Sequence, residues 1–121
     1  MAKNVVSIVD DDESVREAMT DLMKSLGFPA EAFDSAEAFL GSSRRHDTGC
    51  LIADVQMPRM TGLELHRRLV ASGRPIPTIL ITAYPDERGR ARALAAGVIC
   101  YLTKPFDEDG LIGCIRLALR S

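Results

Sequence analysis

The stretch Cys50-Leu51-Ile52-Ala53-Asp54 places an aspartate directly after four apolar residues. A continuous apolar run of this length is typical of a central strand in a parallel sheet, because helices cover both faces of such a strand. Two other runs, Val5–Val9 and Thr78–Ile81, have the same nearly unbroken apolar character. We therefore predict that these three runs form the centre of one parallel sheet.

Two further runs complete the expected sheet. Pro29–Phe33 contains a proline and a glutamate, which an edge strand tolerates, and Val98–Leu102 is the fifth apolar run. The segments between the runs carry apolar residues at helical spacing. We expect the first of these helices to end at Gly27, and the second and last to be capped by Ser35 and Asp107. The pattern predicts an α/β fold of five βα units, (βα)5, with a doubly wound five-stranded parallel sheet.

Length and charge narrow the class of protein. The chain has 121 residues, which suits one domain over 1–121, and a formal net charge of −2, which gives no electrostatic footprint for nucleic acid. The apolar runs are too short to span a bilayer, and no signal peptide pattern opens the sequence. We expect a cytoplasmic protein that does not bind membranes.

Cysteine and histidine spacing does not suggest a metal site. Cys50, Cys100 and Cys114 are an odd number of cysteines at unrelated spacings, so we expect buried, reduced thiols rather than a disulfide. His46 and His66 lie far apart in the sequence without ligand spacing. We expect both histidines at the surface.

Polar residues follow the predicted strands at the point where each strand ends. They are Asp10, Asp11, Asp12 and Glu13 after the first strand, Asp54 after the third, Thr82 and Ala83 after the fourth, and Lys104 after the fifth. In a doubly wound sheet the carboxyl ends of the strands meet at one rim, where ligands bind. Each group has an ordinary explanation when taken alone, as a solvated helix start or a helix cap. Their conjunction predicts a site.

The chemistry of this rim suits phosphoryl transfer. Several carboxylates close together repel each other, and a hard divalent cation such as Mg²⁺ relieves that repulsion with its preference for oxygen ligands. An aspartate beside such a cation, facing the ammonium group of Lys104, can attack a phosphoryl group. The hydroxyl of Thr82 would contact another phosphoryl oxygen.

The ordered set of motifs resembles the receiver domain of bacterial two-component response regulators. The motifs are Val9-Asp10-Asp11, Asp54-Val55-Gln56-Met57-Pro58 with Gly62, Thr82-Ala83, and Lys104-Pro105-Phe106. They cover essentially the whole chain. The segments 8–16 and 34–40 are similar to regulators of the FixJ type. The resemblance implies the CheY-like, flavodoxin-like fold with strand order 2-1-3-4-5.

The resemblance also implies a role for each matching residue. Asp54 would be the phosphoacceptor, and Mg²⁺, for which Mn²⁺ can substitute, would be held by Asp11, Asp54, the backbone carbonyl of Gln56 and, through water, Asp10. The phosphoryl group would be bound by Lys104, Thr82 and the backbone of Ala83, and Thr82 and Tyr101 would be the switch residues. Pro58, Gly62 and Pro105 would shape the loops, with a cis bond at Lys104–Pro105.

For function, the resemblance implies a receiver that takes a phosphoryl group from a sensor histidine kinase. It would catalyse its own phosphorylation and dephosphorylation without being a conventional enzyme. A phosphorylation-dependent homodimer is expected, and DNA would be contacted only through an effector domain, which we do not find in this sequence. A free-standing receiver that acts through protein–protein contacts is the alternative.

Three other classes of protein fit the sequence less well. A haloacid-dehalogenase-like phosphatase needs a second aspartate two residues after the first, where this chain has Gln56. A flavodoxin-like flavin carrier needs a Ser/Thr/Gly-rich phosphate loop after the first strand, where this chain is acidic. A receiver-shaped module that is never phosphorylated is disfavoured by the full set of Asp11, Asp54, Thr82 and Lys104.

Overall fold

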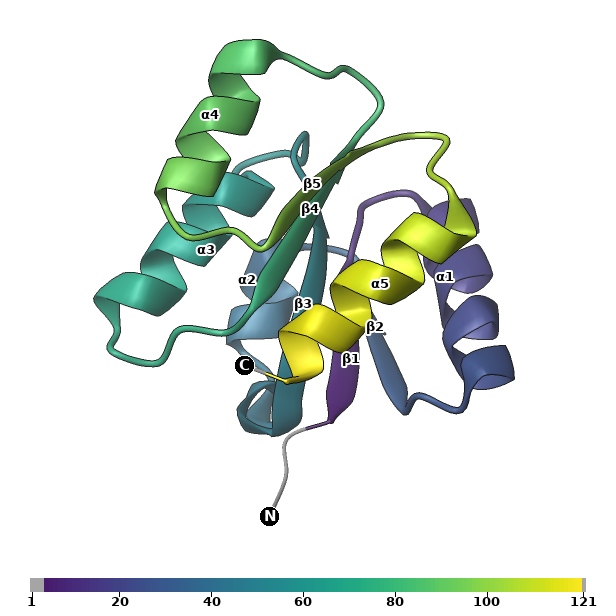
Figure 1. Cartoon of the computed structure of the whole chain (residues 1–121). Coiled ribbons are helices and arrows are strands. Elements are labelled where there is room, and N and C mark those ends of the chain that lie inside the picture. Colours follow the sequence, from purple (N-terminus) through teal and green to yellow (C-terminus); the bar gives the residue numbers. More distant parts are fainter. Residues whose placement is uncertain (1–3, 121) are drawn as a thin grey trace.

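A computed structural model of the chain describes residues 4–120, with the side chain of Arg44 left out. Strands and helices alternate from the start of the chain to its end (Figure 1). The strands are β1 (Val5–Val9), β2 (Ala30–Phe33), β3 (Thr48–Asp54), β4 (Thr78–Thr82) and β5 (Cys100–Thr103). The helices are α1 (Glu13–Leu26), α2 (Ala36–Leu40), α3 (Gly62–Ala71), α4 (Glu87–Ala95) and α5 (Glu108–Leu119), and a 3-10 helix, η1 (Ser43–Asp47), precedes β3.

The five strands form one parallel sheet in the order β2-β1-β3-β4-β5. Every residue of β1, β3 and β4 is buried, whereas β2 at the edge is mostly half-buried. The fold class, the strand order and the central position of the three apolar runs are therefore confirmed. The short η1 helix was not predicted.

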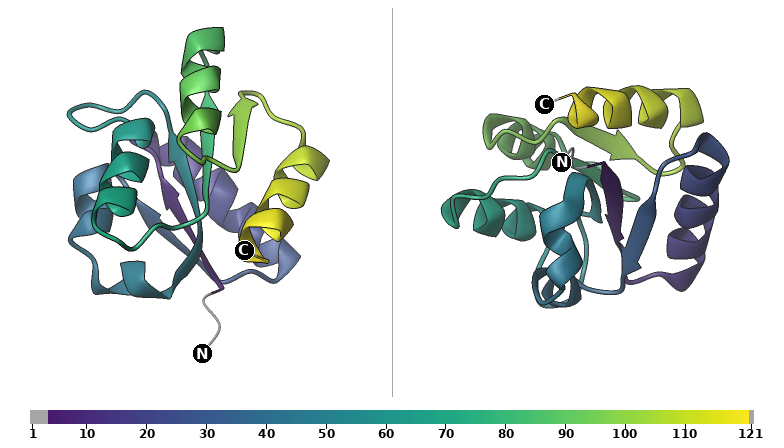
Figure 2. Two further views of the ribbon diagram at one scale, coloured as in Figure 1. Left: turned by 60° about the vertical axis from the view of Figure 1, so that its left-hand side comes forward. Right: turned by 90° about the horizontal axis from the view of Figure 1, so that it is seen from below.

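Helices cover both faces of the sheet and divide the core into two layers. The helices α1 and α5 lie on one face, and α2, α3 and α4 lie on the other (Figures 1 and 2). Met19, Met23 and Ile115 fill the first layer between helix and sheet. Phe39 and Leu65 belong to the second layer. This two-sided cover explains why the central strands have no polar alternation.

Local sequence signals set the ends of the helices as expected. Ser35 accepts a hydrogen bond from the backbone N–H of Ala38, and Asp107 accepts one from that of Gly110, so both residues cap their helices. Gly27 ends α1 with φ of 82°, a left-handed conformation that glycine adopts without the steric cost of a Cβ. The caps Ser35 and Asp107 follow β2 and β5, on the side of the sheet where the strands end.

The expectation that His66 lies at the surface is wrong. Its side chain is buried, because α3 turns it towards the end of α4 and the start of β4. Its Nε2 lies 3.0 Å from the carbonyl oxygen of Ala96, and its Nδ1 lies 3.3 Å from Oγ1 of Thr78. His46 is exposed, as expected.

The expectation of three buried, reduced thiols holds only for Cys50. Cys50 is fully buried in β3, and burial raises the pKa of its thiol to about 12. Cys100 in β5 and Cys114 in α5 are half-buried and form a disulfide. The packing of α5 on β5 brings these two residues together, which their spacing in the sequence did not reveal.

Among residues 4–120, no helix has the length and apolar character needed to cross a bilayer.

Candidate functional site

Three aspartates meet at the carboxyl ends of β1 and β3. Asp10 is fully buried and Asp54 is 7% exposed, while Asp11 is exposed to solvent. One carboxylate oxygen from each lies within 4.8 Å of the other two. The neighbouring positions of β1 and β3 in the sheet bring these carboxylates together from distant parts of the sequence.

Lys104 reaches this cluster from the loop after β5. Its Nζ donates a hydrogen bond to Oδ2 of Asp54 at 2.8 Å and another to Oδ2 of Asp10 at 3.1 Å. Partial burial alone lowers the pKa of Lys104, but the two hydrogen bonds and the two carboxylate charges outweigh it and raise the pKa above its usual value. The side chain is therefore a permanent cation between two buried acids.

The pKa of Asp10 is raised as well, and here burial is the main cause. Loss of solvent raises the pKa of Asp10 more than the hydrogen bonds from Asp12 and Lys104 lower it, and the charge of Asp54 raises it further. One ammonium group thus contacts two buried carboxylates, and the exposed carboxylate of Asp11 adds a third negative charge to the cluster. The cluster therefore carries more negative than positive charge, and a bound cation would reduce the repulsion among the carboxylates.

Backbone groups hold the two buried carboxylates in place. The N–H of Asp12 donates to Oδ1 of Asp10 at 2.9 Å, and the N–H of Gln56 donates to Oδ1 of Asp54 at 2.9 Å. Nη1 of Arg16 donates to the carbonyl oxygen of Asp10 at 2.7 Å. Each carboxylate therefore has one oxygen fixed by the chain and the other directed at Lys104.

Thr82 ends β4 next to this cluster, but its hydroxyl is engaged elsewhere. Oγ1 donates to Oε1 of Gln56 at 2.6 Å and accepts from the N–H of Tyr84 at 3.0 Å. The side chain of Gln56 is a contact that the sequence reasoning missed, since only its backbone carbonyl was assigned a role. Ala83 follows Thr82 at the same rim and is exposed.

Tyr101 lies on the side of β5 that faces α4, away from α5. Its ring is 7% exposed and packs in the same core layer as Leu80 and Ala93. The ring of Tyr101 is therefore turned inward in this structure.

Two loops shape the rim. Gly62 begins α3 so close to β3 that a Cβ there would lie 2.5 Å from the backbone oxygen of Asp54. Pro58 lies in the same loop and is exposed. The Lys104–Pro105 peptide bond is cis, as the resemblance implies.

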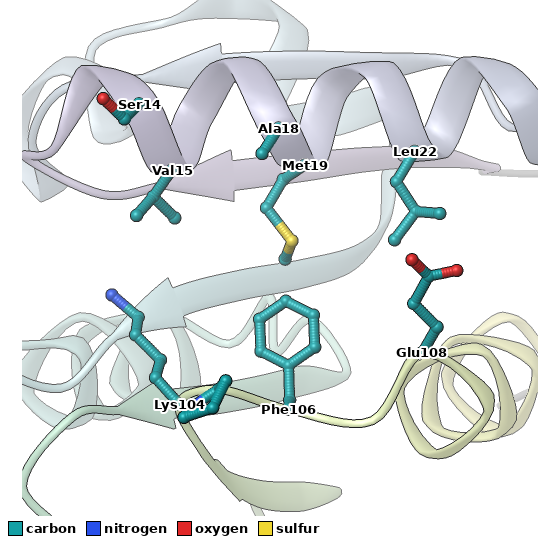
Figure 3. A pocket seen from close by; sticks show the side chains of 9 residues that line it. Ser14, Val15, Ala18, Met19, Leu22, Lys104, Phe106 and Glu108 are labelled. Atoms are coloured by element: carbon teal, nitrogen blue, oxygen red, sulfur yellow. The ribbon is translucent and has the colours of Figure 1, made fainter.

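An open groove of about 390 Å³ borders the site between α1 and the chain that follows β5. Val15, Met19 and Leu22 of α1 form one wall, and Phe106 faces them from the other side (Figure 3). Lys104 lies at one end of this groove and Glu108 at the other (Figure 3). The groove therefore places an apolar surface beside the charged cluster.

The donor set fits a hard divalent cation. All three candidate ligand atoms are carboxylate oxygens, which Mg²⁺ and similar ions prefer, and nitrogen or sulfur ligands are lacking in the cluster. The exposed position of Asp11 leaves one side of the cluster open to water, which Mg²⁺ usually retains. The acidic cluster is thus of the kind that receiver domains use to bind Mg²⁺.

Comparison with known proteins agrees with this geometry. Residues 6–116 match the family described as "Response regulator receiver domain". The response regulator protein TodT of Pseudomonas putida is 44% identical over 117 residues, covering 97% of this chain and 52% of TodT. The transcriptional regulatory protein FixJ of Bradyrhizobium diazoefficiens is 35% identical over 118 residues, covering 98% of this chain and 58% of FixJ.

Solved structures give the same assignment. The response regulator StyR superposes with a TM-score of 0.90 at 44% identity, covering 98% of this chain and 60% of that structure. FixJ-N superposes with a TM-score of 0.87 at 36% identity, covering 99% of this chain and 96% of that structure. The chain spans a little over half the length of the curated relatives it matches. It belongs to the response regulator receiver family, a family of phosphorylation-activated signalling modules of two-component systems, and it resembles the receiver domain of FixJ.

Proposed function

We propose that Asp54 is the residue that takes the phosphoryl group. The observation that carries this proposal is that Asp54 both contacts Lys104, whose Nζ lies 2.8 Å from its Oδ2, and belongs to the cluster with Asp10 and Asp11. Asp10 is fully buried and Asp11 belongs to the exposed side of the cluster. Asp54 is the acid that combines a contact with the ammonium group and a place at the end of the central strand.

The chemistry of the step is nucleophilic substitution at phosphorus. A carboxylate oxygen of Asp54 forms the new P–O bond, while the bond from phosphorus to the leaving group of the donor breaks. The donor is a phosphohistidine of a sensor histidine kinase or a small acyl phosphate. Lys104 stays protonated throughout and stabilises the negative charge on the phosphoryl oxygens, as its raised pKa favours.

We assign the divalent cation to Asp11, Asp54 and the backbone carbonyl of Gln56, with Asp10 acting through water. Mg²⁺, or Mn²⁺ in its place, would supply positive charge to the phosphoryl oxygens and relieve the repulsion among the carboxylates. Asp10 and Asp54 are held ready for this role by the N–H groups of Asp12 and Gln56.

The switch follows from the hydroxyl of Thr82. A phosphoryl group on Asp54 adds about −1.5 to −2 charge and new acceptor oxygens. Thr82 would then leave Oε1 of Gln56 and donate to a phosphoryl oxygen instead, and the backbone N–H of Ala83 would bind another. This movement changes the packing above Tyr101, which lies one strand further across the sheet.

The output surface that we propose consists of α4, β5 and α5. Its exposed ends carry both signs of charge, as a self-complementary two-fold interface requires. The charged residues are Arg88, Arg90, Arg92, Asp107, Glu108 and Asp109. We propose that phosphorylation favours a homodimer through this face and so controls a transcriptional effector domain, with contact to other proteins as the alternative output.

The assignment of Asp54 is tested by intact mass. Incubation with acetyl phosphate and Mg²⁺ should add one phosphoryl group to the wild type and none to Asp54→Asn, which keeps the shape but loses the nucleophile. Asp86→Asn is the matched control, because Asp86 caps α4 and is not a member of the acidic cluster. A stable, Mg²⁺-dependent adduct on Asp54→Asn would disprove the assignment.

The dimer is tested separately by sizing with and without beryllofluoride as the phosphoryl mimic. A monomer in both states, at concentrations well above those in a cell, would remove the dimer from the proposal. It would leave the phosphoacceptor assignment intact.

A further inference from the structure

The half-buried cysteine pair, Cys100 and Cys114, lies outside the acidic site. Cys100 is the first residue of β5, and Cys114 lies in the middle of α5. The structure joins them in a disulfide with their Cα atoms 6.3 Å apart, inside the usual range of about 4.4–6.8 Å. The bond ties α5 to the edge strand of the sheet.

Access distinguishes this pair from the third cysteine. Cys100 and Cys114 are both half-buried, so part of each residue is exposed to solvent. Cys50 is fully buried, and its thiol with a pKa of about 12 does not form the thiolate that exchange requires. The chain therefore contains a reactive pair and an inert internal reference.

The disulfide is not the only contact that holds α5 on the sheet. The inner face of α5 is already buried against the sheet through Leu111, Ile115 and Ala118. Burial of these side chains holds the helix in place when the sulfurs are reduced. Reduction would loosen α5 without unfolding the domain, which is the property that a reversible modification needs.

We propose that Cys100 and Cys114 are a thiol–disulfide modification site, oxidised by low-molecular-weight disulfides and reduced by the corresponding thiols. The thiolate of one cysteine attacks the small disulfide, forms a mixed disulfide and releases one small thiol. The second cysteine then attacks the protein sulfur of the mixed disulfide, closes the Cys100–Cys114 bond and releases the second small thiol. Two protein thiols are oxidised and one small disulfide is reduced.

The site has a direct structural consequence for the rest of the domain. The strand that carries Cys100 continues with Tyr101 and leads into Lys104, and α5 begins with acidic residues of the surface proposed for dimerisation. Oxidation fixes this helix to this strand. On the basis of the proposed function, the redox state would set how firmly the output surface is held, but the modification itself does not depend on Asp54.

The experiment is thiol counting in glutathione mixtures. The wild-type chain and Cys50→Ala are equilibrated at graded ratios of oxidised to reduced glutathione, trapped with N-ethylmaleimide and measured by intact mass. At the oxidising end, Cys50→Ala should carry no maleimide and lack the mass of two hydrogen atoms. At the reducing end, it should carry two maleimides. The native wild-type chain should carry the same numbers of maleimides. When it is denatured, Cys50 should add one further maleimide.

Four results would overturn the proposal. The pair could remain reduced, and therefore be alkylated, at the most oxidising ratio. It could also remain closed at the most reducing ratio, which would make the bond a permanent structural one. The oxidised product could also be a glutathione adduct or a dimer linked between two chains. The single variants Cys100→Ser and Cys114→Ser serve as references for these last two products, because neither can close the internal bond.

Two further readouts check that the bond acts on α5. The oxidised form should melt roughly 10 °C above the reduced form, because the bond closes a loop across a sequence separation of 14 residues. Hydrogen exchange should slow in α5 but not in α1. Equal melting and equal exchange in both redox states would contradict a role in fixing the helix. Asp54→Asn should give the same redox results as wild type, so a failure of the phosphoacceptor assignment remains distinguishable.

Discussion

The hydroxyl of Thr82 donates a hydrogen bond to Oε1 of Gln56 at 2.6 Å and accepts one from the backbone N–H of Tyr84 at 3.0 Å. A threonine has only one hydroxyl proton, so this contact occupies its whole capacity as a donor. Thr82 therefore cannot donate to a phosphoryl group on Asp54 until it leaves Gln56. The side chain two residues after Asp54 thus competes with the phosphoryl group for the switch residue.

Replacing Gln56 by leucine should favour the phosphorylated conformation. Gln56→Leu keeps much of the volume but removes the acceptor, so Thr82 no longer loses a hydrogen bond when it turns to the phosphoryl group. A hydrogen bond contributes about 0.5–1.5 kcal/mol, so we expect beryllofluoride to bind two- to tenfold more tightly in the presence of Mg²⁺, an order-of-magnitude range. Isothermal titration calorimetry measures this affinity.

The double variant supplies the control for Gln56. In a Thr82→Val background the hydroxyl is missing, so Gln56→Leu should change the affinity little, and the two substitutions should be strongly non-additive. An equal gain in both backgrounds would show that Gln56 acts on the mimic without Thr82.

Removing the ammonium group of Lys104 should destabilise the domain. Lys104→Met leaves Asp10 and Asp54 without their shared partner in a poorly hydrated space, and we expect the free energy of unfolding to fall by about 1–3 kcal/mol at neutral pH. Millimolar Mg²⁺ should then raise the melting temperature more than it does in wild type, because the cation relieves a larger repulsion. Thermal melts with and without Mg²⁺ measure both effects.

Lys24→Met is the matched control for Lys104. Lys24 is exposed in the last turn of α1, so its loss should change stability by less than about 1 kcal/mol and should leave the response to Mg²⁺ unaltered. The interpretation fails if the two variants lose the same stability.

Substitution of Asp10 should stabilise the domain at neutral pH when divalent cations are absent. Burial raises the pKa of Asp10 in the folded state above its value of 3.8 in the unfolded chain. At pH values between these two pKa values, Asp10 binds a proton in the folded state more than in the unfolded state. The free energy of unfolding therefore falls as pH rises through the raised pKa. Above the raised pKa this unfavourable contribution is complete. Asp10→Asn removes it, and we expect the free energy of unfolding to rise.

The gain from Asp10→Asn should shrink as pH drops below the raised pKa, where the wild-type carboxyl becomes neutral. Urea denaturation in a chelating buffer over a series of pH values measures this dependence. Asp12→Asn is the control, because it makes the same change in charge at an exposed helix cap where asparagine serves equally well. A gain for Asp10→Asn that is constant across pH would contradict burial as its cause.

Adding one methyl group at Gly62 should be severely destabilising. A Cβ at this position would lie 2.5 Å from the backbone oxygen of Asp54 and 2.9 Å from a side-chain carbon of Leu80. The first contact is with the backbone of the site, which has little freedom to move. We expect Gly62→Ala to lose about 2–4 kcal/mol of stability and to bind beryllofluoride more weakly.

Gly113→Ala makes the same chemical change as Gly62→Ala, but we expect the opposite effect on stability. A Cβ at Gly113 would meet no heavy atom within 4 Å, and the residue lies inside α5. We expect a gain of about 0.5–1 kcal/mol from the higher helix propensity of alanine. Chemical denaturation of both variants separates the close approach at Gly62 from a general effect of glycine.

The sequence by itself determined the fold class and the place of the site. The apolar runs of β1, β3 and β4 are local features, and burial of both faces is a direct consequence of their composition. Because the carboxyl ends of parallel strands share one rim, the residues that follow those runs had to converge. Capping by Ser35 and Asp107 was also readable, since a cap depends on residues within one turn.

Only the tertiary structure decided the contacts between side chains from different elements. Thr82 and Gln56 are 26 residues apart, and His66 and Ala96 are 30 apart. Cys100 and Cys114 are separated by 14 residues, in a strand and a helix that each have an ordinary pattern. No local signal predicts such pairs, because each depends on how far a helix is rotated and shifted when it packs on the sheet. Close packing of the core sets that rotation collectively, through many side chains at once, so it does not belong to any one segment of the sequence.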